Sequence, residues 1–142
     1  MDRTVERLIR THPANIRQHF AVIVSSDGRK VLAWGASRLT AEGFDHAEEN
    51  AVRELASRNY DGRALRRLTM IVARSTNDKL RASKPCVDCC RLIRNAHMFQ
   101  WVCYSTSEGV YERVRARDLH SDYMSTGRAA MCAERNAAAC AC

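Results

Sequence analysis

The chain has 142 residues, of which 46% are hydrophobic and 27% charged, and its formal net charge is +7 at pH 7. This composition excludes a disordered or fibrous protein, and the length suits one domain over residues 1–142. No apolar run approaches the roughly 18 residues of a membrane span, and residues 1–20 do not form a signal-peptide core, so we expect an intracellular, cytoplasmic protein with no membrane partner.

The first part of the chain is predicted to contain a helix, a hairpin and a second helix. Apolar residues at helical spacing predict a short helix over residues 2–10. Two apolar runs, Phe20–Val24 and Val31–Trp34, predict a β-hairpin that turns at Asp27-Gly28. An amphipathic helix is expected from His46 to about Arg58. Its buried face would consist of Ala47, Ala51 and Leu55.

The second part of the chain adds three strands and a third helix. Leu68–Ala73 is apolar throughout, as expected of a strand covered on both faces. Pro85 suits the first position of a helix that carries Leu92, Ile93 and Ala96. Strands are expected at Phe99–Tyr104 and Val110–Val114, and their short connection requires an antiparallel pair because a parallel crossover needs a dozen or more residues. The element order therefore predicts a mixed sheet with helices packed on it.

The seven cysteines are the first indication of a functional site. An odd number in a chain without a secretory signal favours metal ligands and free thiols over a disulfide framework. Cys86 and Cys89 lie at i and i+3 in the expected first turn of a helix, so their sulfurs share one face. The helix N-terminus lowers a thiol pKa, and the thiolate is the form that binds zinc.

A second motif, His46-Ala47-Glu48, completes a candidate zinc site. One His and two Cys ligands leave the fourth tetrahedral position open for water, as in catalytic zinc sites. The Glu48 carboxylate could then take a proton from that water and deliver it to a ring nitrogen and a leaving amine.

Each half of this pattern also has an interpretation without catalysis. Asp45 and Glu48 fit a capping box with Asp45 as the N-cap. An isolated C-x-x-C pair is often structural or redox-active, and Cys90, at i+4 from Cys86, is an alternative ligand to Cys89. We favour the zinc site with Cys89 because the other interpretations require several coincidences.

The two motifs together carry a resemblance to a known family. His46-Ala47-Glu48 and Pro85-Cys86-Val87-Asp88-Cys89 match the H-x-E and P-C-x-x-C signature of zinc deaminases, and the chain from about residue 16 to 117 resembles the cytidine deaminase-like superfamily. The resemblance implies a three-layer α/β fold with a five-stranded mixed sheet, helices on both faces and the last two strands antiparallel. It places the zinc site at the N-terminal ends of two adjacent helices, with Glu48 catalytic and His46, Cys86 and Cys89 as ligands.

Substrate contacts follow from the same resemblance. The backbone near Ala47 and Pro85 is expected to hold the base edge, and Phe44 could stack on the base. Ser37 stands where the family often has an Asn that contacts the sugar.

The C-terminal segment, residues 118–142, is expected to be a tail. Its Met131–Asn136 stretch resembles the Cys-Ala-Glu-Arg motif of free-cytidine deaminases, but no partner motif follows it.

The function expected from these residues is zinc-dependent hydrolytic deamination of cytosine to uracil in a free nucleoside or nucleotide. The antiparallel pair of last strands favours this small substrate, because it resembles the free-nucleoside branch. One alternative is a deaminase of single-stranded DNA or RNA, suggested by the charge of +7. Another is an inactive, zinc-stabilised binding module, suggested by Ser37 and the Cys-rich end. We also expect a homo-oligomer, because relatives complete their sites with residues from a neighbour.

Overall fold

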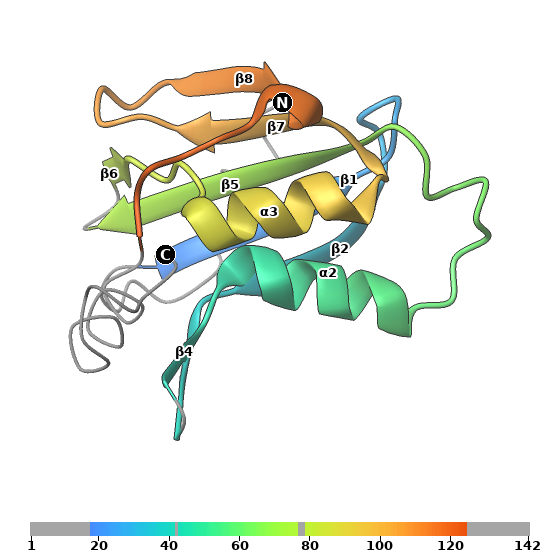
Figure 1. The fold of residues 1–142 in the computed structure, drawn as a ribbon, viewed down its shortest axis with the longest axis horizontal. Coiled ribbons are helices and arrows are strands. Elements are labelled where there is room, and N and C mark those ends of the chain that lie inside the picture. The colour runs from blue at the N-terminus through green and yellow to red at the C-terminus, as the bar shows by residue number, and fades with distance from the viewer. Residues whose placement is uncertain (1–17, 42, 77–78, 125–142) are drawn as a thin grey trace, which may run out of the picture.

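The computed structural model describes residues 18–41, 43–76 and 79–124 (Figure 1). They form a mixed sheet in the order β2-β1-β5-β7-β8, to which the short β6 is added beside β5, and a separate two-stranded sheet, β3-β4. The α/β class and the mixed sheet are as predicted. The strands are β1 (Gln18–Val24), β2 (Val31–Ala36), β3 (Arg38–Thr40), β4 (Gly43–Asp45), β5 (Leu68–Thr76), β6 (Lys79–Arg81), β7 (Phe99–Ser105) and β8 (Tyr111–Arg115), the helices α2 (Ala47–Ser57) and α3 (Val87–Ala96), and a 3-10 turn η1 (Ala116–Asp118).

The predicted hairpin is confirmed as the antiparallel pair β1-β2. Its turn contains Gly28 at φ 72°, a left-handed conformation that glycine adopts without steric cost. The Asp27 carboxylate accepts hydrogen bonds from the Ser25 hydroxyl at 2.6 Å and the Arg29 backbone N–H at 3.0 Å. These bonds, that from Ser25 above all, lower the pKa of Asp27 and fix the turn.

The central strand is β5, which pairs antiparallel with β1 and parallel with β7. Its Leu68, Met70 and Val72 are fully buried, as expected for the interior of a sheet. β8 returns antiparallel to β7, which confirms the direction predicted from the short connection. The sequence did not predict the three-residue strand β6, which pairs with the end of β5.

Both described helices lie on one face of the sheet (Figure 1). Their buried residues join those of the strands in one apolar cluster, which includes the predicted helix face Ala47, Ala51 and Leu55. The predicted helix over residues 2–10 lies outside the described residues, and so does the motif at Met131–Asn136. A helix on the other face of the sheet, as expected from the resemblance, is therefore not among the described elements. In the described part of the chain, no helix has the length and apolar character needed to cross a membrane.

Close packing of α2 on β2 depends on Gly35. A Cβ atom added at this position would lie 2.7 Å from the backbone oxygen of Ala47 and closer still to the backbone nitrogen of Ala51. Because both neighbours are helix backbone, they cannot move aside without shifting α2. Gly35 therefore sets the distance between the helix and the sheet.

Replacing Gly35 by Ala should force α2 away from β2 and destabilise the fold by about 1–3 kcal/mol, the usual cost of overpacking. Gly62→Ala is the matched control, because a Cβ there would meet no atom within 4 Å. Urea unfolding of the two variants measures the difference. Equal stability of Gly35→Ala and wild type would contradict this account of the packing.

Candidate metal centre

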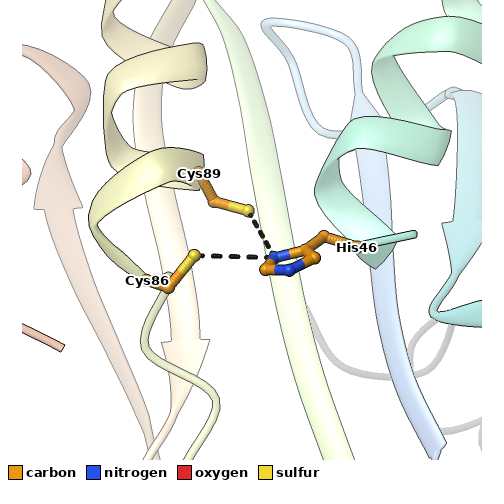
Figure 2. Close-up of side chains that lie close together, drawn as sticks. All are labelled: His46, Cys86 and Cys89. Carbon is orange, nitrogen blue, oxygen red and sulfur yellow. Dashed lines mark hydrogen bonds between the residues drawn. The ribbon is translucent and has the colours of Figure 1, made fainter. Parts of the chain in front are cut away.

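The N-terminal ends of α2 and α3 bring three metal-ligating side chains together. His46 is the N-cap of α2, Cys86 is the N-cap of α3, and Cys89 lies in the first turn of α3. Neither N-cap side chain makes a capping hydrogen bond. Both sulfurs and the imidazole point toward one another across the gap between the helices (Figure 2).

The ligand atoms of the three residues all lie within 4.8 Å of one another. Nδ1 of His46 is 3.2 Å from Sγ of Cys89 and 3.5 Å from Sγ of Cys86. The two cysteines are only 4% and 3% exposed. The arrangement is therefore a compact, largely buried cluster of one nitrogen and two sulfur donors.

Two details of the predicted helix starts need correction. α3 begins at Val87, so Pro85 precedes the N-cap instead of occupying the first helical position. The N-cap of α2 is His46, so the capping box with Asp45 as N-cap is wrong. The Asp45 carboxylate instead lies 3.5 Å from Arg38 and 3.9 Å from Arg53.

The structure distinguishes Cys89 from Cys90, the alternative candidate ligand. The Cys90 sulfur lies 3.5 Å from the backbone oxygen of Pro85, and the side chain belongs to the apolar core beneath the helices. Burial raises the pKa of the Cys90 thiol to about 11. Cys90 is therefore a core residue, and Cys89 is the cysteine that faces His46.

Hydrogen bonding within the cluster favours a thiolate at Cys86. The hydrogen bond from Cys89, supported by His46, lowers the pKa of Cys86 to about 4 against the opposing effect of burial. The same hydrogen bond holds the proton on Cys89 and raises its pKa, and the bond to Cys86 raises the pKa of His46. Of the two cluster thiols, Cys86 is therefore the one that favours the thiolate, the form that binds a metal ion.

Glu48 lies beside the cluster in the first turn of α2. Its side chain is 1% exposed, and its Oε2 has no hydrogen-bond partner in the described part of the chain. A buried polar atom without a partner costs about 1–3 kcal/mol and is rare in folded proteins. The unpaired carboxylate oxygen is therefore available to a group that enters the site.

A cavity of about 420 Å³ adjoins the cluster. Of the four predicted substrate contacts, Ser37 lines it, whereas Ala47 and Pro85 are buried and do not. The backbone of Phe44 belongs to β4, and its side chain lies outside the described part. The lining also contains residues that the sequence analysis did not single out. The full lining is His19, Ser37, Asp45, His46, Glu48, Arg74, Ala82, Ser83, Lys84, Cys86, Ser121 and Tyr123.

Ser83 positions the segment that leads to Cys86. Its buried hydroxyl donates a hydrogen bond to the backbone oxygen of Val72 at 2.8 Å and accepts one from the backbone N–H of Ser105 at 2.8 Å. Its own N–H donates to the backbone oxygen of Ser105 at 2.9 Å. These bonds tie the segment before α3 to the middle of β5 and to the end of β7.

Replacing Ser83 by Ala should leave buried backbone groups unpaired and lower the free energy of unfolding by about 1–3 kcal/mol. The control is Ser107→Ala, at an exposed position in the β7-β8 turn, which should change stability little. Urea unfolding compares the two. If Ser83→Ala and Ser107→Ala are equally stable, the hydrogen-bond network does not hold this segment.

Comparison with protein families identifies the chain. Residues 4–105 match the model of the cytidine and deoxycytidylate deaminase zinc-binding region. The matched range contains both motifs of the cluster. The chain therefore belongs to this family.

Solved structures agree on the fold. A cytidine deaminase from Burkholderia pseudomallei has a TM-score of 0.60 and 19% identity, over 85% of this chain and 94% of that chain. A cytidine deaminase from Mycobacterium tuberculosis has a TM-score of 0.55 and 16% identity, over 88% and 98%. A sequence search of curated proteins finds no match. At these identities the likeness concerns the fold.

Proposed function

We propose that this protein is a zinc-dependent deaminase that hydrolyses the 4-amino group of cytosine in a free nucleoside or nucleotide. The observation that carries the proposal is the placement of His46, Cys86, Cys89 and Glu48 together beside one cavity. Membership of the deaminase family supports the same activity.

The donor set fits zinc. Two cysteine sulfurs and one imidazole nitrogen are preferred zinc donors, and three protein ligands leave a position open, as in catalytic sites. Glu48, with its unpartnered Oε2, lies beside these three donors. It does not belong to the group of possible metal ligands, so it is not a fourth ligand. His46, Cys86 and Cys89 would hold the ion. Zinc bound there supplies Lewis-acid activation of water at neutral pH.

Glu48 is proposed to carry the protons of the reaction. Deamination consumes one water molecule: a C–O bond forms at the ring carbon, the C–N bond breaks and ammonia leaves. Glu48 accepts a proton from the attacking water and delivers it to the ring nitrogen, then assists protonation of the leaving amine. Its burial holds the carboxyl group in place and keeps bulk water from competing for its free oxygen.

The metal assignment predicts close to one zinc ion per chain in the purified protein. His46→Ala, Cys86→Ala and Cys89→Ala should each lose metal, because each removes one of three ligands. Cys90→Ala and Cys103→Ala are the controls, since these buried thiols lie outside the cluster. Metal analysis by mass spectrometry measures the content. Full zinc retention in Cys86→Ala would exclude the site.

The catalytic assignment predicts that Glu48→Gln keeps its zinc but loses activity by about 10²-fold or more, the usual contribution of general acid–base catalysis. Glu49→Gln is the control, because its exposed side chain lies one position along the same helix turn. Ammonia release is measured with cytidine, deoxycytidine, their monophosphates and cytosine. Turnover of none of these by wild-type, zinc-loaded protein would refute the proposed function, and so would turnover confined to single-stranded oligonucleotides.

A further inference from the structure

Three polar side chains form a row across the sheet where the helices begin. Ser37, His19 and Arg74 lie on neighbouring strands or strand ends: His19 pairs with Arg74, and the Ser37 N–H donates to the His19 backbone oxygen at 2.9 Å. Side chains alternate between the two faces of a strand, so His19 shares the helix-covered face with the buried Ala21, and Arg74 shares it with Val72. All three line the cavity beside the candidate metal centre.

The hydrogen-bonding groups of this row are largely unused. Nε2 of His19 is buried and has no hydrogen-bond partner among the described residues. Within the same described ranges, the Arg74 side chain makes neither a hydrogen bond nor an ion pair. The Arg74 side chain is half-buried, and a guanidinium without a carboxylate partner in the described ranges is a ready binding group for an anion.

The cavity lining contains both cationic and acidic side chains. Lys84, two residues before Cys86, adds a second permanent cation to the lining. Of the acidic lining residues, Asp45 lies within ion-pair distance of Arg38 and Arg53, which are outside the cavity lining. The other, Glu48, stands at the candidate metal centre. We call His19, Arg74 and Lys84 the cationic wall of the cavity, because it contains both permanent cations of the lining.

We infer that this wall, formed by His19, Arg74 and Lys84, binds a phosphate group on the sugar of the substrate, so that the enzyme acts on a free cytosine nucleoside monophosphate in preference to the nucleoside. The inference rests on the proposed function. Arg and Lys are the side chains that recognise phosphate, Arg through paired N–H donors. The cavity volume of about 420 Å³ is in the range of small-molecule sites and can hold one nucleotide.

The same wall explains how a nucleotide could be selected although Ser37 replaces the expected Asn. A phosphate carries negative charge that a guanidinium can bind through two hydrogen bonds, whereas the short Ser37 hydroxyl offers the sugar only one donor. Binding the phosphate would orient the nucleotide without a strong sugar contact. Specificity would then come from leaving Arg74 and His19 unpaired when a nucleoside binds, because unpaired polar groups in a site are costly.

The first experiment compares zinc-loaded wild-type protein on deoxycytidine and deoxycytidine monophosphate, and on cytidine and cytidine monophosphate. The kcat/KM of the monophosphate should exceed that of its nucleoside by about tenfold or more, and the ratio should fall as salt screens the charges. In Arg74→Gln the ratio should fall toward one, mainly through a loss of kcat/KM for the monophosphate. Arg81→Gln is the matched control: Arg81 is the cross-strand partner of Arg74 on β6, and it is exposed and outside the cavity lining.

A binding experiment separates this inference from the proposed function. Calorimetry on wild-type holoenzyme measures the affinity for deoxyuridine monophosphate and deoxyuridine, the product forms, which requires no turnover. The monophosphate should bind about tenfold tighter, and Arg74→Gln should remove the difference while Arg81→Gln keeps it. Equal affinity and equal kcat/KM for nucleoside and monophosphate would overturn the phosphate wall while deamination stood. Faster turnover of a single-stranded oligonucleotide than of the monophosphate would also overturn it.

Discussion

The meeting of two helix N-termini at one end of the sheet is the constraint on which the candidate site depends. α2 brings His46 and Glu48, and α3 brings Cys86 and Cys89, so neither helix carries the site alone. The backbone N–H groups at a helix N-terminus favour nearby negative charge, which agrees with the thiolate form favoured at Cys86, the N-cap of α3. Gly35 lets α2 approach the sheet closely, and Ser83 ties the chain before α3 to β5 and β7. The position of each donor thus depends on backbone packing outside the cluster.

Along β5 and β1, the side chains on the helix-covered face change from apolar to polar. The polar side chains line the cavity. On the helix-covered face of β5, Met70 and Val72 lie in the core and Arg74 lines the cavity. On the adjacent β1, Ile23 and Ala21 likewise lie in the core, and His19 lines the cavity. Beyond the helix starts, strand side chains no longer have helix residues to pack against, so polar groups are tolerated there. The end of the sheet can therefore carry polar groups without weakening the core.

The sequence was sufficient to predict the donors of the cluster because each motif is local. His46 and Glu48 are two residues apart, and Cys86 and Cys89 are one helix turn apart, so spacing alone places each pair. Helix starts were less accurate because Pro85 is compatible both with the first helical position and with the residue before the N-cap. The short strands β3, β4 and β6 were missed because three residues carry no recognisable periodicity.

The cationic wall could not be predicted from spacing, because it depends on strand register. His19 and Arg74 are far apart in the sequence, and only the pairing of β1 with β5 places them side by side. A shift of one residue in that register would have turned one of them to the opposite face. The substrate-binding roles of Ala47, Pro85, Ser37 and Phe44 stay predictions, as does the homo-oligomer.

The burial of Glu48 links the candidate chemistry to the stability of the fold. Burying a carboxylate is costly unless an opposite charge or hydrogen bonds compensate it, yet Oε2 of Glu48 has no partner in the described ranges. The nearby Cys86 favours its thiolate, which has the same sign, so within the cluster only His46 can contribute positive charge. A divalent cation held by His46, Cys86 and Cys89 would balance these negative groups. Because the three donors come from two helices, binding such an ion would also hold α2 and α3 together. The free energy of metal binding would then contribute to the free energy of folding.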